Sequence, residues 1–253
     1  RKVFGCLDEM CDRLRRDQSP RQLAAAVTLY HVIIEGTLAQ PGQHFMESWI
    51  EELDILPGFR EGIRNVALDE QRHIAFGVKL LADLYAENPR ETQDAIVQTI
   101  REVGPYTAAI AMPPGWDETY YTDFGFTYDE LAIEGTRSLE FRLRAIGLDL
   151  EAIPRFPIAM DLPLEERARR GRVLLEANLT GPDRPAVRDP YAIATMFDVL
   201  RSTAEPSAVK PGTVIQWDFT DHEPWHLTVG HDGTTAAPGP ATSPDMRLAI
   251  AFD

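Results

Sequence analysis

One stretch of the sequence places polar side chains where a helix should be hydrophobic. Between Gly62 and Tyr85, residues at alternating steps of three and four positions would line a single helix face. Those residues are Ile63, Val66, Glu70, His73, Gly77, Leu80 and Leu84. Glu70 and His73 therefore interrupt a stripe that is otherwise apolar. Burying an unpaired carboxylate costs roughly several kcal/mol, so such a group is normally hydrogen-bonded, paired with a cation or bound to a metal ion.

A second carboxylate lies in an even more apolar segment. Glu35 sits within residues 32–38, which are apolar on nearly every side of a helix, so we expect its carboxylate to be buried. Glu70 and His73 are about 60° apart around a helix axis, so both can reach one metal ion. Oxygen and imidazole donors suit iron or manganese better than a metal that prefers thiolates. Helical bundles with two-metal carboxylate centres use this Glu-x-x-His unit on inward helix faces.

The same residues also permit a metal-free interpretation. Glu70 and His73 would then form a hydrogen-bonded pair in the core, and Glu35 would bond to His31 one helical turn earlier. His31 shares a helix face with Glu35 and is an alternative ligand to the metal. Tyr30, taken on sequence alone, is more typical of a core aromatic than of a reactive phenol.

Composition excludes several classes of partner. The 253 residues carry a formal net charge of -15, which argues against nucleic acid or an anionic membrane surface as the main partner. No apolar run is long enough to predict an integral membrane segment. Cys6 and Cys11 fit neither a disulfide framework nor a zinc site, and we interpret them as reduced thiols of a cytoplasmic protein.

The chain changes character near residue 180. The first part predicts helices, including one that begins at Ser19-Pro20 and others at residues 91–106, 128–146 and 164–178. Residues 180–185 are typical of a linker, and one further helix is predicted at 191–201. The apolar period then becomes two at residues 215–219, 225–229 and 246–252, which predicts half-buried antiparallel strands. We expect two domains, at residues 1–180 and 188–253.

Two segments resemble one family of metalloenzymes. Residues 30–39, from Tyr30 to Ala39, and residues 69–77, from Asp69 to Gly77, are similar to paired helices of the ligand-binding oxidases related to the small subunit of ribonucleotide reductase. The tyrosine five residues before Glu35 and the 35-residue separation of Glu35 and Glu70 (70 − 35 = 35) fit that family.

The resemblance implies a ferritin-like all-α bundle with two metal ions, Mn/Fe or Fe/Fe, that activate dioxygen. It also implies a long-chain fatty-acid-like ligand, and we expect a homodimer. Carried over by motif, Glu35, Glu70 and His73 would be metal ligands. Tyr30 would match the tyrosine that becomes ether-linked to a nearby valine.

The family's remaining ligands have no counterpart in this sequence. Three more, a Glu and another Glu-x-x-His, come from two earlier helices in that family, and residues 1–29 do not supply them. We therefore expect the bundle to be partial. We also expect both ends of the chain to be truncated, since it opens at Arg1 without a methionine and closes directly after a predicted strand. We also expect the chain alone to hold half of the site, to bind metal weakly or not at all, and to be inactive.

The strand region resembles a different family. Residues 214–219 and 223–229 are similar to segments of sterol-carrier-protein type-two domains, which are small α/β modules with an apolar tunnel for lipids. The resemblance covers about residues 188–253 and lacks that domain's closing segment. The whole chain then suggests an oxygen-activating oxidase fused to a lipid-carrier-like module. Two alternatives are a radical-generating ribonucleotide reductase subunit and a metal-free lipid-binding or carrier protein.

Overall fold

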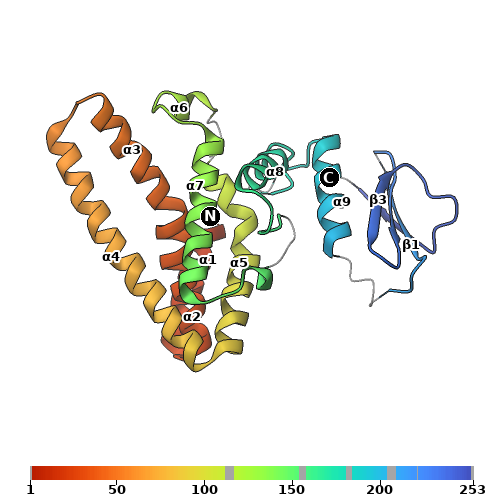
Figure 1. Ribbon diagram of the computed structural model, residues 1–253, viewed down its shortest axis with the longest axis horizontal. Helices are drawn as coiled ribbons and strands as arrows, with labels where there is room; N and C mark the ends of the chain where they lie inside the picture. The colour runs from red at the N-terminus through yellow and green to blue at the C-terminus, as the bar shows by residue number, and fades with distance from the viewer. Residues whose placement is uncertain are drawn as a thin grey trace. The chain divides into compact units, whose positions relative to one another are not determined.

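The structure is a computed structural model of the chain. It describes residues 2–111, 117–153, 158–180, 184–203, 209–220 and 222–251. The chain forms two compact units: the first comprises Arg1–Ile153 and Met160–Arg169, and the second comprises Pro154–Ala159 and Arg170–Asp253. Helices make up the first unit, and the second contains a small sheet (Figure 1). The expected domain boundary between residues 180 and 188 stays a prediction, because residues 181–183 lie outside the described part of the chain.

The helical unit follows the predicted order of elements. Its elements are α1 (Lys2–Arg16), α2 (Pro20–Val27), the π-helix η1 (Thr28–Ala39), α3 (Gln40–Glu52), α4 (Pro57–Glu87), α5 (Pro89–Ala111), the single turn α6 (Thr119–Thr122), α7 (Tyr128–Ile146) and the 3₁₀ turn η2 (Leu150–Ala152). Helix α8 (Leu164–Glu176) contributes residues to both units. Helices α3 and α4 are in contact and run side by side in Figure 1.

Capping residues explain where two of these helices begin and end. The Ser19 hydroxyl accepts a hydrogen bond from the Gln22 backbone N–H, and Pro20 occupies the first turn of α2, as predicted. Thr127 and Glu130 form a reciprocal capping box at the start of α7. Gly147 ends α7 with φ of 94°, a left-handed conformation that favours glycine. The predicted helix at 128–146 is therefore confirmed residue for residue.

A long π-helical segment carries Glu35. In η1 the backbone bonds span five residues, as in the bond from the Gln40 N–H to the Glu35 carbonyl. Pro41 has no N–H to give to Gly36, which lies five residues before it. The Ser138 hydroxyl of α7 donates to the Gly36 carbonyl instead, at 2.7 Å. The neighbouring helix thus satisfies the acceptor that the proline leaves free.

Two apolar clusters form the core of the helical unit. One joins α2, η1, α4, α5 and α7 around Val32, Leu81, Ile96 and Leu143. The other joins α1, η1 and α5 around Val3, Leu29 and Val103. Buried residues of α4 begin only at Ile74, so the second half of this helix anchors it in the core.

The second unit is a four-stranded sheet with helix α9 (Pro190–Thr203) against it. The strands are β1 (Val214–Phe219), β2 (Trp225–Val229), β3 (Thr234–Pro238) and β4 (Met246–Ile250), in the sheet order β3-β2-β1-β4. β1, β2 and β3 form an antiparallel meander. Phe197 of α9 stacks on Trp225 at a centroid distance of 4.8 Å and contacts Trp217 edge-on.

Strand β4 departs from the prediction in two ways. It pairs with β1 in parallel, with Leu248 opposite Trp217, whereas the sequence predicted antiparallel strands throughout. Since β2 occupies one edge of β1, β4 adds to the other edge after a crossover from β3. All five of its residues are exposed, so it is not half-buried, because no described element packs over it. Strand β3 was not predicted, since its small residues carry no strong alternation.

One helical segment passes a simple test for a membrane span. Pro20–Glu52 is long and apolar enough to cross a bilayer by length and composition, although the sequence predicted no membrane segment. Half of its most apolar stretch is buried inside the protein, and buried core helices share this length and composition. The segment includes η1, which the clusters described above place in the core.

Candidate metal centre

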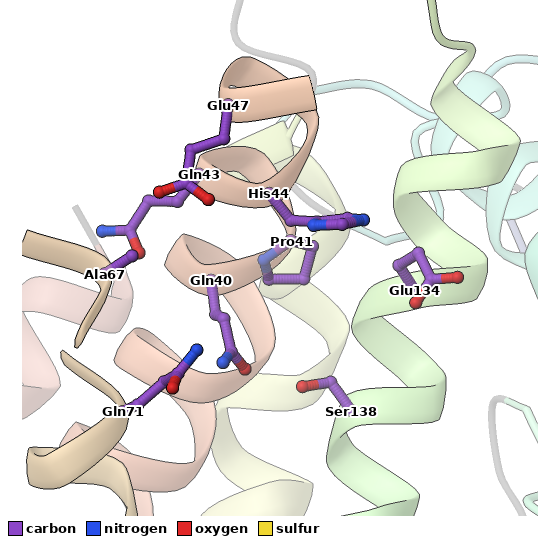
Figure 2. Close-up of a pocket in the computed structure, with 9 residues that line it drawn as sticks. All are labelled: Gln40, Pro41, Gln43, His44, Glu47, Ala67, Gln71, Glu134 and Ser138. Carbon is purple, nitrogen blue, oxygen red and sulfur yellow. The ribbon is translucent and has the colours of Figure 1, made fainter. Parts of the chain in front are cut away.

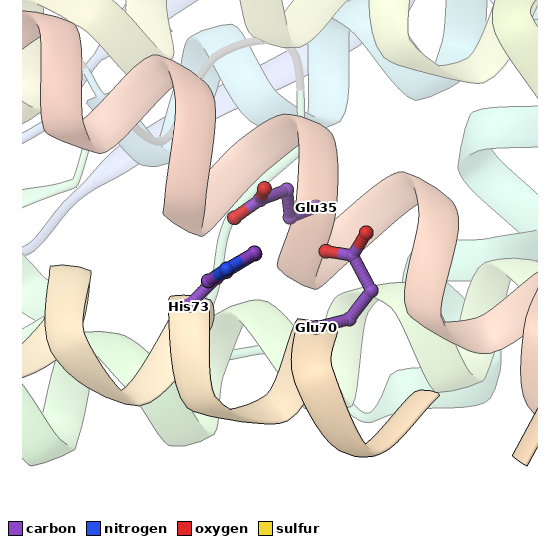
Figure 3. A group of neighbouring side chains, drawn as sticks. All are labelled: Glu35, Glu70 and His73. Carbon is purple, nitrogen blue, oxygen red and sulfur yellow. The ribbon is translucent and has the colours of Figure 1, made fainter. Parts of the chain in front are cut away.

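Two helices bring the three predicted ligands together. Glu35 projects from η1, and Glu70 and His73 project from α4 toward it (Figure 3). One carboxylate oxygen from each Glu and one ring nitrogen of His73 all lie within 4.8 Å of one another. This is the spacing at which three side chains can converge on a cation.

The three side chains differ in their access to solvent. Glu35 is 6% exposed, as its apolar surroundings predicted. Glu70 is half-buried, and its Oε2 is fully buried with no hydrogen-bond donor among the described residues. His73 is exposed, and so is Val66, whose side chain is 50% exposed. The prediction that the whole α4 stripe is buried is therefore wrong for its first half.

The cause is the packing of α4. Ile74, Gly77, Leu81 and Leu84 are buried, whereas no residue of α4 before Ile74 is. Regular spacing of apolar residues shows which face can be buried, but a neighbouring element must cover that face. Helix α3 and η1 both contact α4, but they leave His73 and Val66 exposed.

His31 makes the hydrogen bond that the metal-free interpretation predicted. Its Nδ1 lies 2.7 Å from Glu35 Oε2. Gly77 of α4 makes room for this histidine, because a Cβ at position 77 would lie 2.4 Å from the His31 Cβ. His31 thus positions the Glu35 carboxylate and competes for one of its oxygens. It is not part of the group of three side chains described above.

Tyr30 lies beside the carboxylates but is not a core residue. Its side chain is 42% exposed, which contradicts the interpretation as a core aromatic. A hydrogen bond with Glu35 is the largest cause that raises the pKa of Tyr30, followed by the Glu35 charge, burial and the more distant Glu70 charge. The phenol is therefore held in its protonated form. Its cross-link to a valine stays a prediction.

The donor set fits a divalent cation. Two carboxylates close together in a partly buried site repel each other, and a cation would offset that repulsion. The buried, unpartnered Glu70 Oε2 is the atom that most needs such a partner. Asp69, the neighbour of Glu70, is exposed and accepts a hydrogen bond from Arg72 at 2.7 Å. Glu35, Glu70 and His73 therefore form a group that could hold a metal ion.

A buried arginine escaped the sequence analysis. Arg142 of α7 is 6% exposed and packs over Gly36 on η1. The sequence could have indicated that Arg142 is buried, because it lies at helical intervals from Gly135 and Ile146. All three residues are buried in the structure. A polar pocket between α3, α4 and α7 lies near it, with Gln43, Glu47 and Glu134 in its lining (Figure 2).

Comparisons with known proteins return R2-like ligand-binding oxidases. No family model matches the chain. An R2-like ligand-binding oxidase from Sulfolobus acidocaldarius is 26% identical with a TM-score of 0.48, and the match covers 66% of this chain and 52% of that one. A tyrosine-to-phenylalanine variant of such an oxidase, with an anaerobically reconstituted Mn/Fe cofactor, is 27% identical with a TM-score of 0.47, covering 55% and 48%. A valine-to-isoleucine variant with an aerobically reconstituted Mn/Fe cofactor is 25% identical with a TM-score of 0.48, covering 56% and 52%. The chain thus spans about half the length of the structures it matches.

Proposed function

We propose that this chain carries half of the ligand set of a dinuclear metal oxidase that activates dioxygen. The observation that carries the proposal is the convergence of Glu35, Glu70 and His73, from two helices, within 4.8 Å. The unsatisfied Glu70 Oε2 and the Glu-x-x-His motif on α4 support it.

Each side chain would have a distinct role in this centre. The two carboxylates would bind or bridge the metal ions, and the His73 ring nitrogen would bind one of them. When bound, a Mn/Fe or Fe/Fe pair would supply the redox chemistry. His31 would hold the Glu35 carboxylate in place through its hydrogen bond. Tyr30 would keep its proton beside Glu35, ready for the ether cross-link that the motif implies.

The finer parts of the proposal rest on the sequence motifs. The resemblance of residues 30–39 and 69–77 to the ligand-binding oxidases suggests a long-chain fatty-acid-like ligand and a homodimer. The strand motifs of β1 and β2 suggest a lipid-carrier-like module of the sterol-carrier type. The composition and the two free cysteines suggest a cytoplasmic protein.

Titration with Mn(II) tests the metal centre in the chain itself. Free Mn(II) is followed by its electron paramagnetic resonance signal, which is lost on binding. We expect weak but saturable binding that falls roughly tenfold or more in Glu35→Gln, Glu70→Gln and His73→Gln, because each removes one ligand atom. Asp69→Asn is the matched control, since Asp69 neighbours Glu70 but pairs with Arg72.

The outcomes separate the alternatives. Equal Mn(II) affinity in Glu70→Gln and Asp69→Asn would contradict the site. Absence of binding up to millimolar Mn(II) would mean that these three side chains do not hold a metal ion by themselves, as in the metal-free interpretation with its His31–Glu35 hydrogen bond. If metal binds, the mass of the peptide that contains Tyr30 in the full-length protein distinguishes a cross-linked oxidase from a ribonucleotide reductase subunit, which needs no such link.

A further inference from the structure

A buried cation on α7 packs against the segment that carries Glu35. Arg142 is 6% exposed, and its guanidinium lies over Gly36, the residue after Glu35. It donates to the Ser138 carbonyl at 2.7 Å, to the Ser138 hydroxyl and to the Gln40 side-chain oxygen. All three acceptors are neutral, and burial lowers the pKa of Arg142 with no carboxylate of the described residues to counteract it. Arg142 therefore acts on its surroundings through directional hydrogen bonds rather than through an ion pair.

The two residues that accept from Arg142 also bond to the backbone beside the Glu35 side chain. The Glu35 carbonyl accepts from the Gln40 backbone N–H. The next carbonyl, that of Gly36, accepts from the Ser138 hydroxyl at 2.7 Å. Gln40 of α3 and Ser138 of α7 both line the pocket in Figure 2. Arg142 thus links the two residues whose donors satisfy consecutive carbonyls at Glu35 and Gly36.

The bond from Arg142 also sets the direction of the Ser138 hydroxyl. A serine hydroxyl has one proton to donate and two lone pairs with which to accept. Since the guanidinium donates to this oxygen, the Ser138 proton points away from it, to the Gly36 carbonyl. Successive hydrogen bonds of this kind strengthen one another in a buried site. Without Arg142 the hydroxyl would be free to turn, and the Gly36 carbonyl opposite Pro41 would lose its donor.

A π-helix needs such support more than an α-helix does. π-helical backbone is rare and is mostly confined to single turns, whereas η1 extends over 12 residues. Pro41, at the start of α3, removes one more backbone donor from this segment. A guanidinium can bond two partners at once because its donors form a rigid planar fork, which a flexible ammonium does not reproduce. An arginine at position 142 is therefore suited to brace the backbone from Glu35 to Gln40.

We propose that Arg142 is a positioning residue of the candidate metal centre, which holds Glu35 in place by bracing the backbone of η1 through Ser138 and Gln40. Arg142 is not among the three converging side chains, so it acts on a metal ion only through the placement of Glu35. Its effect on metal binding rests on the proposed function, whereas its effect on the backbone rests on the hydrogen bonds alone.

Amide hydrogen exchange in the presence of EDTA tests the bracing without any metal. The probe is the Gln40 backbone N–H, which donates to the Glu35 carbonyl. Arg142→Gln should speed its exchange about tenfold, because buried groups left without a partner destabilise the bonded segment by roughly that factor. The amide of Leu81, in the core part of α4, should exchange as before. Unchanged exchange at Gln40 in folded Arg142→Gln would refute the proposal.

Titration with Mn(II) tests the effect on the metal centre. Arg142→Gln should weaken Mn(II) binding roughly tenfold or more, as loss of a residue that orients a ligand typically does. Arg142→Lys should weaken it similarly, because one ammonium cannot hold Ser138 and Gln40 together. Full affinity in Arg142→Lys would show that a buried charge is enough, which overturns the proposal. Arg144→Gln is the matched control on α7, since Arg144 is exposed and pairs with Glu140.

Ser138→Ala covers the case in which Arg142→Gln fails to fold, as judged by circular dichroism. It deletes only the hydroxyl that donates to the Gly36 carbonyl and leaves Arg142 in place. Mn(II) affinity and protection of the Gln40 amide should both fall. The double variant should be little worse than Arg142→Gln alone, because both residues act through one chain of bonds. Additive losses of Mn(II) affinity, or no change in Ser138→Ala, would contradict the proposal.

A core truncation separates positioning from a general loss of stability. Leu148 is 3% exposed, belongs to the apolar cluster around Leu81 and follows the end of α7. Leu148→Ala should lower the urea midpoint at least as much as Arg142→Gln and keep its Mn(II) affinity. An equal loss of Mn(II) affinity in both variants would reduce Arg142 to a merely structural residue. If the unsubstituted chain binds no Mn(II), the proposed function fails, and exchange at Gln40 still shows whether Arg142 braces the backbone at Glu35.

Discussion

At the scale of single residues, Glu35 is the side chain on which the candidate centre depends. It is buried, it accepts from His31, and it raises the pKa of Tyr30 by hydrogen bonding and by its charge. It also lies within reach of Glu70 and His73. A metal ion at this site would therefore have to share Glu35 with His31 and Tyr30. The free chain keeps the carboxylate positioned through these hydrogen bonds.

The ionisation of Tyr30 reports on this arrangement. We expect Tyr30 to titrate above the ordinary tyrosine value of about 10, and Glu35→Gln to return its pKa toward that value. Glu70→Gln should lower it less, because the Glu70 charge is the smallest of the four causes. Ultraviolet difference titration against Tyr30→Phe isolates this phenol from the other six tyrosines (7 − 1 = 6). A larger effect from Glu70→Gln would contradict the geometry.

At the scale of elements, the close approach of η1 and α4 decides where the ligands meet. Gly77 allows that approach, because any larger residue would collide with His31. The π-helix η1 passes into the α-helix α3 next to Pro41, and Ser138 of α7 satisfies the Gly36 carbonyl that this proline leaves without a donor. Three helices thus cooperate to place one carboxylate.

A pair of glycine substitutions in α4 tests this contact. Gly77→Ala should destabilise the protein by about 1–3 kcal/mol, because the added methyl group overpacks against His31. Gly62→Ala, in the same helix, should stabilise it by about 0.5–1 kcal/mol, because no atom lies within 4 Å of the new Cβ and alanine favours the helix. Urea unfolding followed by circular dichroism measures both. Destabilisation by the two substitutions to the same extent would show that the contact with His31 has no role.

At the scale of the whole molecule, each unit has a core of its own. Val32, Leu81 and Leu143 belong to the core of the helical unit, whereas Ile193, Phe197 and Leu227 belong to that of the sheet unit. The candidate metal centre and Arg142 both lie in the helical unit. Because each unit has its own core, a core substitution in one unit should change the stability of that unit and not of the other.

Core truncations in the two units should therefore have separable effects. Phe197→Ala should cost the sheet unit about 3–5 kcal/mol, since Phe197 contacts Trp217, Phe219 and Trp225. It should leave Mn(II) affinity unchanged. Leu81→Ala should cost the helical unit about 2–5 kcal/mol and weaken Mn(II) binding, because Leu81 anchors α4. Tryptophan fluorescence during urea unfolding, together with the Mn(II) titration, distinguishes these outcomes.

Local chemistry allowed much of this structure to be predicted. Thr127, Glu130 and Gly147 fix the ends of α7 through interactions with their own neighbours in the chain. Ile215, Trp217 and Phe219 alternate with polar residues, and this local pattern predicted strand β1. The spacing of Glu70 and His73 on one helix, and the apolar surroundings of Glu35, pointed to the candidate ligands. These features depend on residues a few positions apart, so the sequence alone determined them.

Contacts between distant segments were decided only by the tertiary structure. The exposure of His73, the parallel pairing of β4 with β1 and the burial of Arg142 each depend on which element packs against which face. Periodicity shows that a face can be buried, but it does not show what covers that face. The bond between His31 and Glu35 lies within one helix, yet the room for it comes from Gly77 on another. The sequence supplied the chemical groups, and packing between helices set their solvent access and partners, because both depend on neighbours far away in the chain.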